Sequence, residues 1–172
     1  MRDKSVQILV ESGVMVALAA ILNMIQLYAM PNGGSVTPGS MVPILFLAWR
    51  RGIKTGVIAG LAFGVLDFMF KPYFLHWAQF FLDYLLAFGI LGLMGLWKQK
   101  KDAITISIGV VLISILRLIV HITSGVIFWS EGMDFGAAVA FSTSYNASYM
   151  VPEAIIALII MLLLTRREWN FE

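Results

Sequence analysis

Apolar residues form long, nearly unbroken runs along the chain, and the stretches between them hold most of the charged, proline and glycine residues. A helix that crosses the hydrocarbon core of a membrane needs about 20 consecutive apolar residues. Runs that approach or exceed this length predict five membrane helices. We expect them at residues 6–28, 53–70, 77–97, 103–129 and 149–164.

A sixth apolar run, residues 41–49, is too short for an ordinary spanning helix. It follows a loop rich in proline, glycine and serine, residues 30–40. Backbone polar groups at membrane depth must be hydrogen-bonded, so this segment needs support from the loop or from protein around it.

The basic residues decide between five crossings and six, because they concentrate on the cytoplasmic side of a membrane protein. If six segments alternate, ten of the 12 Lys and Arg residues fall on one face. Leaving out the short segment scatters them over both faces. We therefore predict an all-α integral membrane protein, a single domain over residues 1–172, with six transmembrane helices and both ends in the cytoplasm. The ten residues are Arg2, Lys4, Arg50, Arg51, Lys54, Lys98, Lys100, Lys101, Arg166 and Arg167.

Composition supports lipid as the surrounding solvent. The chain is 60% hydrophobic and 13% charged, whereas soluble domains carry about 25% charged residues. The basic residues lie in short clusters and the net charge is +2, which is not a pattern for nucleic-acid binding. Cysteine is absent, and no phosphate-binding loop or metal-ligand spacing occurs, so we expect no disulfide, no ATP hydrolysis by this chain and no cofactor.

Small residues recur at helical spacing in two segments. Gly52, Gly56, Gly60 and Gly64 form a bare ridge on one helix face, which lets another helix backbone approach closely. Packing within the protein is the simpler interpretation, and a partner-binding surface is the alternative. The first segment has a shorter version of this pattern.

The most specific group of residues lies in the run 103–129. Arg117, His121, Gly125 and Trp129 follow one another at four-residue intervals and share a helix face. At about 1.5 Å per residue, His121 and Asp83 lie at similar depths below the outer face. A carboxylate, an imidazole and an indole can together line a pocket in which Gly125 leaves room for a flat ligand. For Arg117 we expect a structural role, in which it pairs with a buried carboxylate or with carbonyls at a helix end.

The outer half of the predicted bundle contains five acidic residues. Lys71 is its one basic residue, and Arg117 lies deeper, inside the run 103–129. Such a field attracts a cationic ligand and repels phosphates. Some of these acids can instead be ordinary solvated groups, which applies best to Glu131, Asp134 and Asp67. The five acids are Asp67, Asp83, Glu131, Asp134 and Glu153.

We expect residues 141–149 to form the last outer loop. Asn146 offers both a donor and an acceptor, which suits the edge of a heteroaromatic ring. Tyr145 and Tyr149 could close the mouth of the pocket or act as ordinary interfacial anchors.

Three stretches, residues 121–129, 144–149 and 82–88, resemble the ThiT family, the thiamin-specific substrate-binding (S) components of energy-coupling factor (ECF) transporters. The resemblance implies a six-helix protein of the bacterial cell membrane that captures thiamin from outside and has no enzymatic activity. It also implies delivery together with a transmembrane coupling protein and two ATPase subunits.

Carried over by position, the resemblance assigns ligand contacts to seven residues and docking of the coupling protein to two. Three departures from the family pattern occur: Asp83 stands where some members carry Glu, the loop 30–40 has no aromatic residue to act as a lid, and Phe141 replaces a pocket tyrosine. The ligand-binding residues are Asp83, Tyr84, His121, Gly125, Trp129, Asn146 and Tyr73, and the docking residues are Gly13 and Ala17.

Two other functions stay open from the residues alone. The same fold could bind another flat vitamin or precursor. Alternatively, Asp83 and His121 could couple protons in a stand-alone transporter or serve a membrane enzyme.

Overall fold

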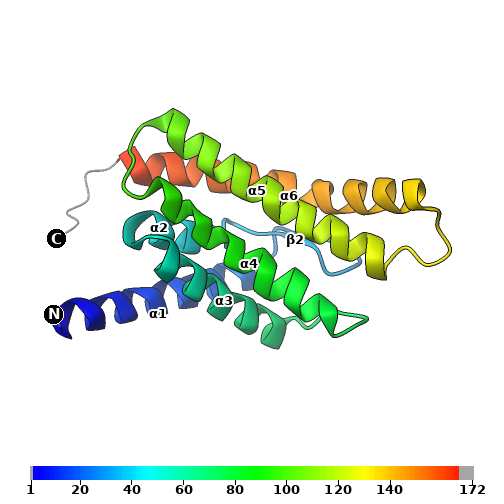
Figure 1. The fold of residues 1–172 in the computed structure, drawn as a ribbon, viewed down its shortest axis with the longest axis horizontal. Coiled ribbons are helices and arrows are strands. Elements are labelled where there is room, and N and C mark those ends of the chain that lie inside the picture. Colours follow the sequence, from blue (N-terminus) through cyan, green and yellow to red (C-terminus); the bar gives the residue numbers. More distant parts are fainter. Residues whose placement is uncertain (1, 167–172) are drawn as a thin grey trace.

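The computed structural model describes residues 2–166, and within them five helical segments are long and apolar enough to cross a membrane. They lie roughly along the long axis of the molecule, and the first turn of α1 and the last turn of α6 are at the same end (Figure 1). The all-α membrane fold is therefore confirmed. The segments are α1 (Arg2–Met24), α3 (Ile53–Phe70), the consecutive η1 (Phe80–Leu86), α4 (Ala87–Gly89) and η2 (Ile90–Trp97), α5 (Ala103–Phe128) and α6 (Phe135–Arg166).

The short sixth segment is helix α2 (Val42–Arg51), and it is surrounded by protein. Residues 25–41 connect α1 to it and include the antiparallel pair β1 (Tyr28–Ala29) and β2 (Ser35–Val36). This segment is mostly exposed as far as Gly33 and mostly buried from Val36 onward. Trp49 at its other end is fully buried, and its indole donates a hydrogen bond of 2.8 Å to the Lys100 carbonyl. The loop and α2 together thus cover the depth of the bundle that a single long helix covers in the other segments.

The glycine ridge of α3 packs against the η1–α4–η2 segment. A methyl group on Gly60 would lie 2.2 Å from the Phe88 carbonyl oxygen, and one on Gly64 would lie 2.5 Å from the Tyr84 carbonyl oxygen. Across the contact, a methyl group on Gly92 would lie 2.2 Å from the Val57 nitrogen. These backbones are in direct contact, so packing within the protein is the correct interpretation of the ridge.

Both helices at the ends of the chain differ from their predicted boundaries. Helix α1 spans Arg2–Met24 rather than residues 6–28, and α6 begins at Phe135 rather than near residue 149. Residues 141–149 are therefore helical and do not form a loop. Their polar side chains Ser142 and Asn146 are buried toward the interior, and a helix with an inward polar face resembles a loop when only hydropathy is considered.

Helix α5 begins with a side-chain cap. The Asp102 carboxylate accepts a hydrogen bond of 2.8 Å from the Thr105 backbone N–H. Hydrogen bonds from Thr105 lower the pKa of Asp102, because they stabilise the ionised carboxylate. The cap fixes where α5 starts, and this sets the depth of the residues that follow it toward Trp129.

Candidate functional site

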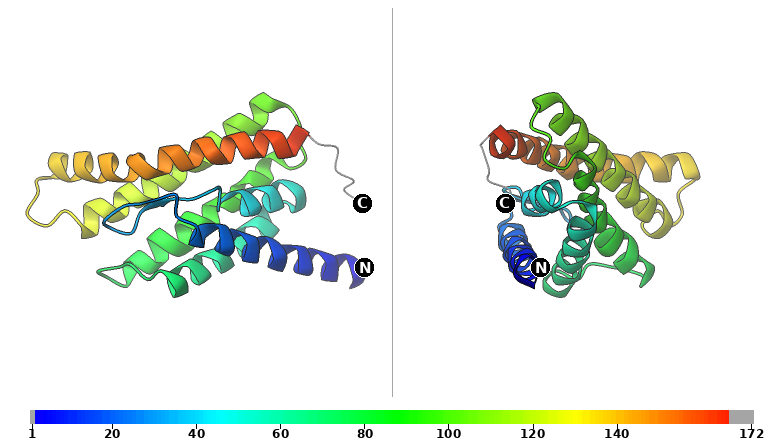
Figure 2. Two further views of the ribbon diagram at one scale, coloured as in Figure 1. Left: turned by 180° about the vertical axis from the view of Figure 1, so that it is seen from behind. Right: turned by 60° about the vertical axis from the view of Figure 1, so that its left-hand side comes forward.

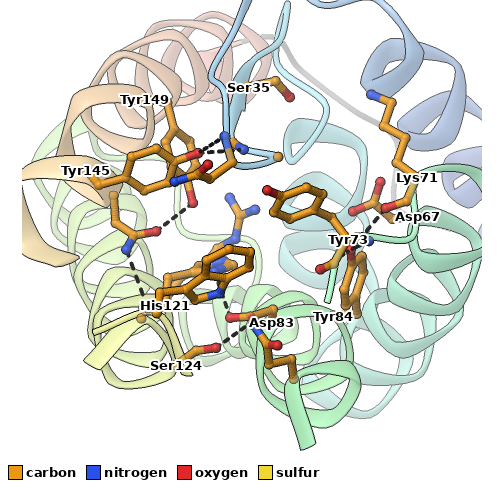
Figure 3. Close-up of a pocket in the computed structure, with 18 of the residues that line it drawn as sticks. Ser35, Asp67, Lys71, Tyr73, Asp83, Tyr84, His121, Ser124, Tyr145 and Tyr149 are labelled. Carbon is orange, nitrogen blue, oxygen red and sulfur yellow. Dashed lines mark hydrogen bonds and ion pairs between the residues drawn. The ribbon is translucent and has the colours of Figure 1, made fainter. Parts of the chain in front are cut away.

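One cavity lies at the end of the bundle that holds the loops 25–41, 71–79 and 129–134. Its empty space, counted with the open mouth, is about 970 Å³. In Figure 3, Tyr145 and Tyr149 face Tyr73 across the opening, and Asp83 and His121 form a third side. All seven residues expected to contact the ligand line this cavity: Tyr73, Asp83, Tyr84, His121, Gly125, Trp129 and Asn146.

Asp83 is at the centre of a hydrogen-bond network on the cavity wall. It lies in the π-helical segment η1, a local widening that often marks functional sites. Asp83 Oδ1 is 3.2 Å from Nδ1 of His121, and Oδ2 accepts a hydrogen bond of 2.6 Å from Ser124 Oγ. The carboxylate is therefore held on both oxygens by groups from α5.

Two aromatic rings stack on each other beside this network. The rings of Tyr73 and Trp129 are stacked, with an interplanar angle of 3° and centroids 5.3 Å apart. Tyr73 in turn packs over Gly33, where a methyl group would lie 2.8 Å from the tyrosine ring. The adjacent Tyr84 is nearly buried, and its hydroxyl accepts a 2.9 Å hydrogen bond from the Tyr73 backbone N–H. Tyr84 thus holds the loop that carries Tyr73.

The expected role of Gly125 as space for the ligand needs correction. A methyl group at Gly125 would lie only 2.1 Å from Ser142 Oγ. The missing side chain therefore allows close approach of α5 and α6, although the residue borders the cavity.

Asn146 is fixed by its neighbours. Its Nδ2 donates to the Ser142 carbonyl at 2.9 Å, and its Oδ1 accepts from the Tyr149 hydroxyl at 2.8 Å. These bonds set the orientation of the amide that borders the cavity.

Tyrosines of α6 hold the first loop over the cavity. The Tyr145 hydroxyl accepts hydrogen bonds from the backbone N–H groups of Asn32, at 3.1 Å, and Gly34, at 3.2 Å. Gly34 lies against Tyr149, where a methyl group would be 2.5 Å from the ring. Residues 30–40 of this loop include no aromatic residue, and the rings beside them come from α6 and the loop after α3.

Arg117 and Glu153 form a nearly buried ion pair at the inner end of the cavity, 3.4 Å apart. Glu153 Oε1 also accepts a hydrogen bond of 2.6 Å from Thr37 Oγ1, and the Arg117 guanidinium lies 4.8 Å from the centre of the Phe88 ring. The predicted structural pairing of Arg117 with a buried carboxylate is confirmed.

Asp67 is not a simple solvated helix end. It accepts a hydrogen bond from the Asn23 side chain, and Lys71 Nζ donates to the Asn23 carbonyl. All three residues border the cavity. Burial lowers the pKa of Lys71, and the negative charge of Asp67 opposes this shift. In contrast, Glu131 and Asp134 are exposed in the turn between α5 and α6.

The cavity has a negative formal charge. Three carboxylates line it, Asp67, Asp83 and Glu153, against two permanent cations, Lys71 and Arg117. With His121 neutral, the sum is −1. The two cations are next to Asp67 and Glu153, so Asp83 is the carboxylate without a permanent cation beside it.

Several residues of the cavity are absent from the sequence-based prediction. Ser124 and Gln79 are buried and bond to Asp83, and Asn23 bonds to Asp67. Single small polar residues inside apolar helices follow no periodic pattern, and only the carboxylates they contact could have drawn attention to them.

Comparison with known proteins places the chain in a family. The model of the family described as "Thiamine transporter protein" matches residues 9–171. The chain belongs to the thiamine transporter family. Members are transport proteins rather than enzymes, and with its spanning helices the chain is a multi-pass membrane protein of the bacterial type.

Relatives in this family match over nearly the whole chain. Thiamine transporter ThiT of Bacillus subtilis is 33% identical, over 95% of this chain and 92% of the relative. Thiamine transporter ThiT of Lacticaseibacillus paracasei is 25% identical, over 93% and 87%. The solved structure of ThiT from Listeria monocytogenes superposes with a TM-score of 0.81 at 26% identity, covering 95% of both chains.

The two small residues expected to dock a partner lie on the outer surface of α1. Gly13 and Ala17 are both exposed, and a methyl group on Gly13 would have no neighbour within 4 Å. The surface of α1 is therefore open at this position.

Proposed function

We propose that this member of the thiamine transporter family is the thiamin-binding S component of an ECF-type importer, with thiamin bound in the cavity described above. The observation that carries the proposal is the presence of Asp83, His121 and Trp129 on one cavity with an excess negative charge. The names of the relatives from Bacillus and Lacticaseibacillus support thiamin as the ligand.

The chemistry of thiamin suits these groups. Thiamin is a permanent cation with two flat heteroaromatic rings and no phosphate. The stacked rings of Tyr73 and Trp129 offer flat faces to its rings, including the positively charged one. Asp83, His121 and Asn146 offer polar atoms to the edge of its aminopyrimidine. The excess charge of −1 balances the single charge of the ligand.

The sequence holds no phosphate-binding loop, so ATP hydrolysis that drives uptake would take place in other subunits. We propose that a transmembrane coupling protein docks on α1 at Gly13 and Ala17 and brings two ATPase subunits to the complex. The open surface of α1 supports this, since small residues let a partner helix approach closely.

Binding by the purified protein tests the ligand. We expect one thiamin per chain by titration calorimetry and quenching of tryptophan fluorescence as the ligand stacks on Trp129. Trp129→Ala should weaken binding by about 2–4 kcal/mol, the cost of removing a central aromatic contact from a buried site.

Trp77→Ala is the matched control, because Trp77 is exposed and does not line the cavity. Equal affinity of the Trp129→Ala variant and the wild type would remove the central residue from the site. If a different flat vitamin bound more tightly than thiamin in a competition experiment, the assignment of thiamin as the ligand would be wrong.

Uptake into vesicles tests the energy source. Vesicles with this chain alone should take up no thiamin under a proton gradient, and uptake should need the coupling protein and ATP. Uptake driven by protons alone would favour the stand-alone transporter.

A further inference from the structure

Two fully buried polar residues support Asp83, and the proposed ligand contacts include neither of them. Ser124, on α5, donates its hydroxyl to Asp83 Oδ2 at 2.6 Å. Gln79, directly before η1, donates Nε2 to the same oxygen at 3.4 Å. Each residue is only 1% exposed, and both border the cavity.

The orientation of the Gln79 amide follows from its other bonds. Its Oε1 accepts the backbone N–H groups of Leu75, at 2.6 Å, and His76, at 3.0 Å. A flipped amide would set its NH₂ group against these two donors, so the NH₂ group has to face Asp83. Gln79 therefore links the loop before η1 to the carboxylate.

With Oδ2 occupied in this way, Oδ1 is left for His121. An ionised carboxylate can only accept, so the close approach of the imidazole Nδ1, at 3.2 Å from Oδ1, favours a proton on this nitrogen. In the neutral ring the other nitrogen, Nε2, is then an acceptor. This atom is buried and has no hydrogen-bond partner among residues 2–166, although the ring borders the cavity. A buried polar atom without a partner is rare and suggests that a ligand completes the bond.

We propose that Gln79 and Ser124 are positioning residues that hold Asp83 by Oδ2 and thereby keep neutral His121 in the Nδ1–H tautomer. His121 Nε2 then offers a lone pair to an N–H donor of the ligand, such as the amino group of an aminopyrimidine. The identity of this ligand rests on the proposed function, whereas the tautomer is a property of the free protein.

Nitrogen NMR of the ligand-free protein labelled with ¹⁵N-histidine tests this directly, since protonated and unprotonated ring nitrogens have distinct shifts. The chain has two histidines, and His76→Asn assigns the signals of His121. We expect a protonated Nδ1 and an unprotonated Nε2 in the wild type. Ser124→Ala and Gln79→Leu should each give a mixture of tautomers. Ser124→Thr, which keeps the hydroxyl, should retain the wild-type tautomer.

Thr123→Ala is the matched control, because the Thr123 hydroxyl bonds to the Ile119 carbonyl on the outside of the same helix. It should leave both the spectrum and the affinity unchanged. Ser124→Ala should also weaken thiamin binding by about 10- to 100-fold, as expected when a hydrogen bond to a charged group is lost.

A wild-type His121 with a proton on Nε2, alone or on both nitrogens, would overturn the proposal. Unchanged spectra in both Ser124→Ala and Gln79→Leu would also overturn it. Because the wild-type spectrum needs no ligand and only His76→Asn for its assignment, this part of the test does not depend on the stability of the Ser124→Ala and Gln79→Leu variants. Failure of thiamin to bind would refute the proposed function and leave the assignment of the tautomer standing.

Discussion

At the scale of single residues, the charge of Asp83 is the most informative feature of the cavity. Glu153 has Arg117 at 3.4 Å, and Asp67 has the charge of Lys71 near it. Asp83 is bound by a hydroxyl, an amide and an imidazole, none of which is a permanent cation. The negative charge that remains for a ligand is therefore on Asp83.

Asp83→Asn tests this assignment. The variant keeps the size of the side chain but removes its charge, so we expect thiamin affinity to fall by about 1.5–3 kcal/mol, the range for a hydrogen bond to a charged group. Titration calorimetry measures the change. Glu131→Gln, an equal loss of charge in the exposed turn before α6, is the control and should change affinity little at physiological salt. Equal losses in both variants would mean that the general field, rather than Asp83, attracts the ligand.

The residues that could be predicted from the sequence are those that stand out by type or by spacing. Arg117, His121, Gly125 and Trp129 follow one another at four-residue intervals in and directly after the largely apolar helix α5. Asp83 is a charge within an apolar run. Gln79 and Ser124 act through Asp83, so their importance depends on a contact between two elements. Such contacts follow from packing, and no local pattern in the sequence encodes them.

At the scale of elements, close contact of backbones sets the position of η1 relative to α3. Gly60 and Gly64 lie against carbonyl oxygens of Phe88 and Tyr84, so the glycine ridge and the residue that follows Asp83 belong to one interface. The depth of Asp83 in the membrane thus depends on glycines that have no contact with a ligand.

Gly60→Ala should destabilise the protein, because the added methyl group would lie 2.2 Å from the Phe88 carbonyl oxygen and the two segments would have to separate. Overpacking of this kind costs about 1–3 kcal/mol. We expect a lower midpoint of thermal unfolding in detergent and weaker thiamin binding. Gly13→Ala is the matched control, since its methyl group meets nothing within 4 Å and a helix gains up to about 1 kcal/mol from this exchange. Equal midpoints of thermal unfolding in the two variants would contradict the direct backbone contact between Gly60 and Phe88.

The boundaries of the elements were harder to predict than their number. Residues 141–149 are polar enough to suggest a loop, yet they are a helical part of α6 because Ser142 and Asn146 turn inward to α5 and the cavity. The π-helical form of η1 also has no pattern in its sequence, Phe80–Leu86. In both places the polar groups face the cavity rather than lipid or bulk water. Hydropathy alone does not distinguish a cavity inside the protein from the aqueous surface.

At the scale of the whole molecule, the orientation in the membrane decides which side the cavity faces. The loops around Tyr73 and Trp129 lie at the end opposite to the first turn of α1 and the last turn of α6 (Figure 2). The basic residues predict that those two turns are cytoplasmic. The cavity would then open outward, as capture of an external vitamin requires.

Single cysteines can test this orientation, because the natural sequence has none. Lys101 and Glu131 lie before and after α5, whose 26 residues extend about 39 Å at the helical rise. This length exceeds the hydrocarbon thickness of about 30 Å, so the two positions are on opposite sides of the membrane whichever way the protein is inserted. In intact cells, a membrane-impermeant maleimide should label the Glu131→Cys variant and should reach the Lys101→Cys variant only after permeabilisation. The reverse pattern would place the cavity mouth in the cytoplasm, and the protein could not then bind its ligand from outside.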